Sequence, residues 1–137
     1  MNEMKSRRAG IVAAVVAIGI AGGLALNAQQ PPQVKRNIVM KKDMTIPGRE
    51  AVMVYVELPP GAAEGRHIHP AEAYVFVLEG SISLETEGLP TVTLKAGDVF
   101  QYLPGQVHQA INNGSVTAKL AAVFVAEKGK PLTTPAK

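Results

Sequence analysis

The grouping of the apolar residues constrains the fold of this chain more than any other feature. From residue 37 onward they occur in short continuous or alternating runs, separated by Gly, Pro and Asn turns such as residues 46–48 (Ile-Pro-Gly). Helical periodicity, with apolar residues at i, i+3 and i+4, is nearly absent. Short runs with regular turn signals are typical of an all-β sandwich or barrel, so we expect an all-β fold.

The individual runs predict where the strands lie. We expect strands at residues 37–44, 50–58, 73–78, 81–85, 91–95, 99–102, 107–111 and 118–126. With a further strand expected at residues 67–69, the chain has about nine or ten strands, which indicates a small antiparallel barrel. Residues 73–78 are apolar at every position, which predicts a central strand with one face in the barrel interior and the other against a second layer.

The first 28 residues have the three parts of an export signal. A positive start (MNEMKSRR) precedes an apolar run and then small residues before QQPPQ. We expect cleavage after Ala28, which would make the protein periplasmic or secreted. The alternative is an uncleaved membrane anchor that leaves the domain facing outward, although the apolar run 11–26 is shorter than the roughly 20 residues that span a bilayer. The expected organisation is a signal at 1–28, a linker at 29–36, a barrel at 37–132 and a tail at 133–137.

Charge and cysteine content exclude several classes of function. The formal net charge is +3, but Lys5, Arg7 and Arg8 against Glu3 place +2 of it in the first 28 residues. No other basic cluster is interleaved with aromatic residues, so we expect no nucleic-acid partner, and contact with a membrane only through the N-terminal segment. The chain has no cysteine, which excludes disulfides, thiolate nucleophiles and thiolate metal ligands.

The three histidines of the chain are the main evidence for a site. His67 and His69 are two residues apart, so on a strand their side chains point to one face, and His108 follows a Pro-Gly turn about forty residues later. Three converging imidazoles would hold a divalent transition metal (Fe, Mn, Ni, Cu or Zn) and leave positions open for water or substrate. The alternative at this point is a His-x-His pair on a strand that binds no metal.

The residues around these histidines resemble the two sequence motifs of the cupin superfamily. The first motif, G-x5-H-x-H-x3,4-E-x6-G, matches at Gly61, His67, His69 and Gly80. The second motif, G-x5-P-x-G-x2-H-x3-N, matches at Gly97, Gly105, His108 and Asn112. The resemblance covers residues 37–132 and implies a small single-domain cupin with an export signal. It also implies a double-stranded β-helix (jelly-roll) barrel in which His67, His69 and His108 are metal ligands.

Two positions depart from the motifs. Leu103 stands where the second motif has proline, but the adjacent Pro104 preserves the turn. Ala73 stands where the first motif has its glutamate ligand, and Glu72 comes one residue early. In a regular strand a shift of one residue turns the side chain to the other face, whereas a bulge after Pro70 would aim Glu72 inward. Glu72 is therefore a candidate fourth ligand and catalytic proton acceptor, or else a carboxylate that faces solvent.

The resemblance leaves several functions open. The first is a metal-dependent, dioxygenase-like oxidoreductase that acts on a small molecule, with Glu72 as the base. A metal-assisted isomerase or lyase is the alternative that depends less on Glu72. A non-catalytic module that binds a small molecule or a metal is the third, and a structural or interaction role through an exposed barrel edge is the fourth. Cupins commonly pair, so the resemblance also implies a homodimer.

Overall fold

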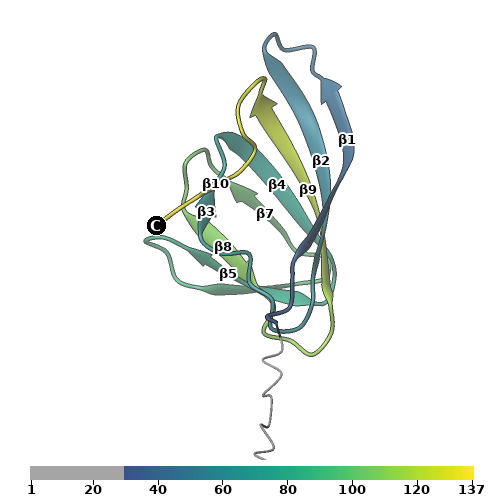
Figure 1. Cartoon of the computed structure of the whole chain (residues 1–137), viewed down its shortest axis with the longest axis vertical. Helices are drawn as coiled ribbons and strands as arrows, with labels where there is room; N and C mark the ends of the chain where they lie inside the picture. Colours follow the sequence, from purple (N-terminus) through teal and green to yellow (C-terminus); the bar gives the residue numbers. More distant parts are fainter. Residues whose placement is uncertain (1–29) are drawn as a thin grey trace, which may run out of the picture.

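The described part of the chain is built from β-strands. The computed structural model describes residues 30–137, and the predicted signal or anchor segment, residues 1–28, lies outside the described residues. Every regular element between residues 30 and 137 is a β-strand, and no helix in this part of the chain is long and apolar enough to cross a membrane. Figure 1 shows the strands as two layers that converge at one end and open at the other.

Two antiparallel five-stranded sheets form these layers. The first sheet has the strand order β1 (Lys35–Asp43), β2 (Arg49–Leu58), β9 (Ala118–Glu127), β4 (Ala71–Glu79), β7 (Val99–Tyr102). The second has the order β10 (Thr134–Pro135), β3 (His67–Ile68), β8 (His108–Ile111), β5 (Ser81–Thr86), β6 (Val92–Lys95). The predicted all-β barrel is confirmed, and each of the predicted strands is present within two residues of its expected ends.

Strict alternation of buried and partly exposed residues places the core between the sheets. Along β2 and β9 every second residue is buried, and the ten-residue pairing of these strands sets Val54 opposite Ala122. Because alternate side chains of a strand point to opposite faces, one face of each sheet is apolar and faces inward. The buried core is made of Val, Ile, Leu and Ala with two aromatic residues, Tyr102 and Phe124.

Gly80 carries the chain from the first sheet to the second. It lies between β4 and β5 and has a φ of 71°, in the region that L side chains rarely adopt. A Cβ at this position would lie 3.0 Å from the Cα of Ala118. The close approach and the positive φ together explain why a glycine ends this strand.

The structure differs from the sequence-based expectation at two places. Residues 133–137 do not form a loose tail, because Thr134 and Pro135 pair with Ile68 and His67 and extend the second sheet as β10. Figure 1 shows this C-terminal segment returning beside β3. The outer face of β4 is not covered by a second layer within residues 30–137, since Tyr74 and Phe76 are 44% and 42% exposed.

Candidate metal centre

The second sheet brings the three histidines together. His67 lies in β3 and His108 in β8, and the antiparallel pairing of these strands sets the two residues directly opposite each other. His69 follows β3 on the same face as His67, as the two-residue spacing predicted. All three side chains are buried, with 6%, 5% and 2% exposure for His67, His69 and His108.

Hydrogen bonds to the backbone define the tautomer of each imidazole. The Nδ1 atom of His67 lies 2.6 Å from the carbonyl oxygen of Gly65. The Nδ1 atom of His69 lies 2.8 Å from the carbonyl oxygen of Leu132, and that of His108 lies 2.8 Å from the carbonyl oxygen of Gln106. A carbonyl only accepts, so in each ring Nδ1–H donates and Nε2 keeps its lone pair. Metal-binding histidines are oriented by the same kind of bond.

The lone pairs of these imidazoles converge. The possible ligand atoms of the three residues lie within 4.8 Å of one another. Among the described residues, the Nε2 of His108 is the buried side-chain polar atom that has no hydrogen-bond partner. An unpaired buried acceptor costs about 1–3 kcal/mol, and a bound cation would offset this cost. The donor set therefore fits a divalent transition metal.

Burial keeps His69 and His108 neutral. Desolvation lowers the pKa of His69 to about 4 and that of His108 to about 3, because a charged imidazolium is disfavoured away from water. Hydrogen bonds to the carbonyls of Leu132 and Gln106 oppose this effect, and the electrostatic influence of the neighbouring His67 ring adds to it. Neutral imidazoles are the form that binds metals, so the site is ready to bind a cation at neutral pH.

An apolar cavity of about 60 Å³ adjoins the histidines. Its aliphatic lining comes from β2, β4 and β9 and includes Val54, Val75 and Leu120. Tyr102 also lines it and stacks on His108, with ring centroids 3.4 Å apart and an interplanar angle of 20°. Burial raises the pKa of the Tyr102 hydroxyl well above its usual range, so this group stays protonated. Tyr102 therefore belongs both to the buried core and to the cavity lining.

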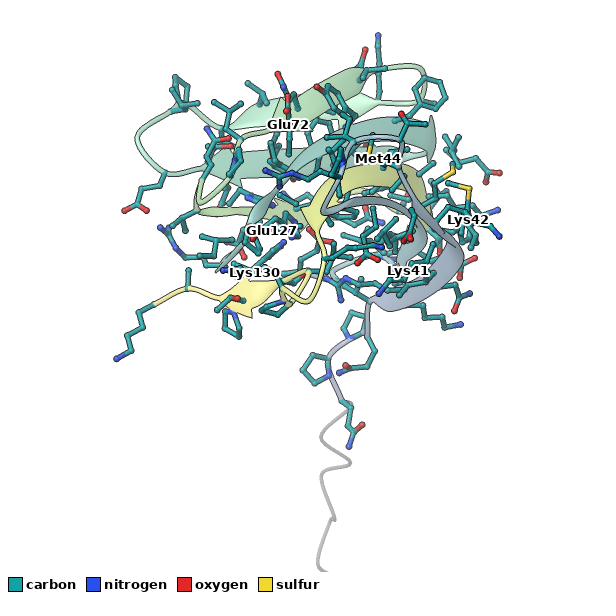
Figure 2. The ribbon with its side chains drawn as sticks, turned by 90° about the horizontal axis from the view of Figure 1, so that it is seen from above. Lys41, Lys42, Met44, Glu72, Glu127 and Lys130 are labelled. Atoms are coloured by element: carbon teal, nitrogen blue, oxygen red, sulfur yellow. The ribbon has the colours of Figure 1, made fainter. Side chains whose placement is uncertain are left out.

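The structure does not bring Glu72 to the histidines. Along β4 the residues alternate, with Ala73 completely buried on the inner face and Glu72 on the outer face. The carboxylate of Glu72 accepts hydrogen bonds from the Tyr74 hydroxyl (2.6 Å) and from the Gln101 amide. Figure 2 shows Glu72 near the margin of the molecule. Because β4 continues without a bulge at this point, Glu72 faces solvent, and the structure does not support a fourth-ligand or catalytic role for it.

A different carboxylate, which the motif comparison missed, borders the cavity. Glu64 lies in the loop between β2 and β3 and lines the cavity with His67 and His69. Its Oε1 accepts a hydrogen bond of 3.1 Å from Arg36. No spacing rule marks this position, since the loop residues between Gly61 and His67 are variable in the motif. The only sign of its role in the sequence is that a charged residue follows the small residues Gly-Ala-Ala at positions 61–63.

Comparisons with known proteins agree with this geometry. The cupin domain family matches residues 54–124, a segment that includes all three histidines. A germin-like protein of Arabidopsis thaliana (subfamily 2 member 1) is 39% identical over 89 residues, which are 59% of this chain and 41% of that protein. The chain thus spans less than half the length of this relative.

Solved structures share the architecture. A double-stranded β-helix protein from Klebsiella pneumoniae superimposes with a TM-score of 0.64 at 24% identity, covering 77% of this chain and 85% of the other. An oxalate oxidase in complex with the substrate analogue glycolate superimposes with a TM-score of 0.56 at 24% identity, covering 61% of this chain and 45% of the other. At this identity the likeness establishes the fold.

Proposed function

Because the chain belongs to the cupin family, we propose that His67, His69 and His108 bind one divalent transition metal and that the protein is a dioxygenase-like oxidoreductase acting on a small molecule. The observation that carries the proposal is the set of three buried imidazoles, whose Nδ1 atoms are all held by backbone carbonyls. The structural likeness to an oxalate oxidase supports an oxidoreductase.

Each part of the site would have a distinct role in catalysis. A bound metal of this kind would polarise an oxygen of the substrate and, if redox-active, exchange electrons with O₂. The backbone carbonyls orient the three rings, and stacking on Tyr102 fixes the plane of the His108 ring. The apolar walls exclude water from the bound molecule, which strengthens electrostatic interactions inside the cavity.

The orientation of Glu72 favours a second candidate, a metal-assisted lyase or isomerase. The dioxygenase-like mechanism with Glu72 as its base requires this carboxylate near the metal, whereas Glu72 points to the outer side of β4. A reaction driven by polarisation of a carbonyl depends less on that carboxylate. The two candidates differ in their need for O₂, which an experiment can separate directly.

The experiment measures turnover by the metal-loaded full chain with and without oxygen. Protein loaded with Fe(II) or Mn(II) is offered a panel of phenolic and diketone-like compounds, and O₂ uptake and products are followed together. We expect turnover with O₂ uptake that is lost in His108→Ala and kept in Glu72→Gln. Turnover of the same compounds under argon would instead identify the lyase or isomerase. Saturable binding without turnover would leave a non-catalytic binding module.

We also propose that the protein is exported and forms a homodimer. The sequence pattern of residues 1–28 supports export to the periplasm or beyond. The exposed apolar side chains of Tyr74, Phe76 and Val99 on neighbouring strands β4 and β7 support self-association, since contiguous exposed apolar surface commonly marks an interface. Cell fractionation tests the first statement, and light scattering at several concentrations tests the second.

A further inference from the structure

Glu64 is held in place beside the histidine-bearing strand. Its backbone N–H donates to the carbonyl of Ala110 (3.0 Å), and its Oε2 accepts a hydrogen bond from the N–H of the same residue (3.3 Å). On β8 the buried positions are His108 and Ala110, so both face the interior. The backbone thus fixes the Glu64 carboxylate next to the strand that carries His108.

The carboxylate of Glu64 is largely removed from water and only partly satisfied. Its side chain is 10% exposed, against 45% for Arg36, its ion-pair partner. An ionised carboxylate has about four lone-pair sites, of which the hydrogen bonds from Arg36 and Ala110 use two. Burying a charged group costs free energy unless the group is paired, and Arg36 forms an ion pair with Glu64. Two acceptor sites of the carboxylate therefore remain unused.

Glu64 lies where two hollows meet. The inner one is the apolar cavity of about 60 Å³ beside the histidines. The outer one, of about 320 Å³, is lined by Arg66 and Pro135 among others. Both are lined by Arg36, Glu64, His67 and Thr133. The Glu64 side chain therefore borders both hollows.

We propose that Glu64 is the proton acceptor of this site and that it selects substrates with a hydroxyl group on a small apolar body. The inference rests on the proposed function, because it assumes a metal at the three histidines. In the proton transfer, the substrate O–H bond breaks, the proton bonds to a carboxylate oxygen of Glu64, and the electron pair stays on the substrate oxygen. The inner cavity is smaller than the roughly 150 Å³ that encloses a benzene ring, so only a part of a few heavy atoms enters it.

The surroundings of Glu64 suit this role. The charged and titratable groups that line the inner cavity with it are Arg36 from β1, His67 and His69 near β3, and Tyr102 from β7. Arg66 is added in the outer hollow, where it pairs with Glu87. Among the described residues that line the inner cavity, Glu64 is the one carboxylate. Glu72, the carboxylate expected from the motif, has no access to this space.

The test uses the full chain loaded with Co²⁺ and acetohydroxamic acid as the probe. This small hydroxamic acid loses its O–H proton when it chelates a metal, and the visible spectrum of Co²⁺ reports its binding. In wild-type protein the released proton passes to Glu64, so we expect a Kd that is independent of pH between 6.5 and 8. In Glu64→Gln the proton is released to solvent, so the Kd should fall about tenfold for each unit by which the pH rises. At pH 6.5 the variant should bind about 10- to 100-fold more weakly.

Controls separate this proposal from a structural role and from the proposed function. Glu72→Gln is the matched variant and should bind the probe as wild type does. Glu64→Asp keeps the charge but shortens the side chain, and we expect at least about tenfold weaker binding with no pH dependence. If all variants take up Co²⁺ and Glu64→Gln keeps the wild-type Kd and pH profile, the role of Glu64 is refuted while the metal site stands. If wild-type protein takes up no Co²⁺, the proposed function itself fails.

Discussion

Acid should destabilise the metal-free protein through the histidine cluster. The pKa of His69 is lowered to about 4 and that of His108 to about 3, while both titrate near 6.5 in the unfolded chain. Between these values the unfolded chain binds more protons than the folded one, so the free energy of unfolding falls as the pH falls. The stabilisation is present in full above about pH 6.5 and is lost toward pH 4 and below.

The size of this effect follows from the proton count. Each histidine that stays neutral in the folded protein contributes a slope of about 1.4 kcal/mol per pH unit, or at most about 4 kcal/mol for the pair between pH 7 and pH 5. Urea denaturation of metal-free protein at pH 7, 6 and 5 measures it. His108→Gln, which cannot titrate, should lose about 2 kcal/mol less than wild type over this range. Equal losses in the two proteins would show that His108 titrates in the folded protein as it does in the unfolded chain, and would refute the reasoning.

Three further predictions concern the supports of the site. Asn112→Ala removes the hydrogen bonds that the side chain donates to the carbonyls of Leu58 and Val116 and the one that it accepts from the N–H of Gly114. The free energy of unfolding, measured by urea denaturation, should fall by about 3 kcal/mol. A change under about 1 kcal/mol would contradict this. Gly80→Ala places a Cβ on a residue with a φ of 71° and close to Ala118, and should lower the free energy of unfolding by about 2 kcal/mol or more. Gly88→Ala is the control that should cost less, because a Cβ there meets no atom within 4 Å. Deletion of residues 133–137 removes β10 and loosens the carbonyl of Leu132 that orients His69. Metal affinity, measured by competition with a chelator, should therefore fall about tenfold. An unchanged affinity would show that β10 does not support the site.

The strands and the histidine cluster could be predicted because their signals are local. Alternation along residues 50–58 and 118–126 reports burial on one face, and glycines such as Gly80 mark the turns. The spacing of His67 and His69 placed both on one face. The strand Thr134–Pro135 was not expected, since two residues carry no periodicity. It pairs only because tertiary structure brings it beside His67–Ile68.

The position of the carboxylates could not be predicted for a different reason. A single-residue offset left the face of Glu72 dependent on whether β4 bulges, which is a property of its pairing with β7 and β9. Glu64 belongs to a loop, where no alternation rule applies, and its place at the cavity follows from its backbone contact with Ala110, 46 residues away. Long-range pairing of this kind leaves no trace in a local pattern.

The metal content of the purified protein tests the central claim most directly. Wild-type protein, purified without chelators and offered Fe, Mn, Ni, Cu and Zn, should hold about one equivalent of metal by elemental analysis. His67→Ala and His108→Ala should lose it, and Glu72→Ala should keep it, because the Glu72 carboxylate faces away from the cluster. Less than about a tenth of an equivalent of every metal in wild-type protein, or full occupancy in both histidine variants, would contradict the three-histidine site.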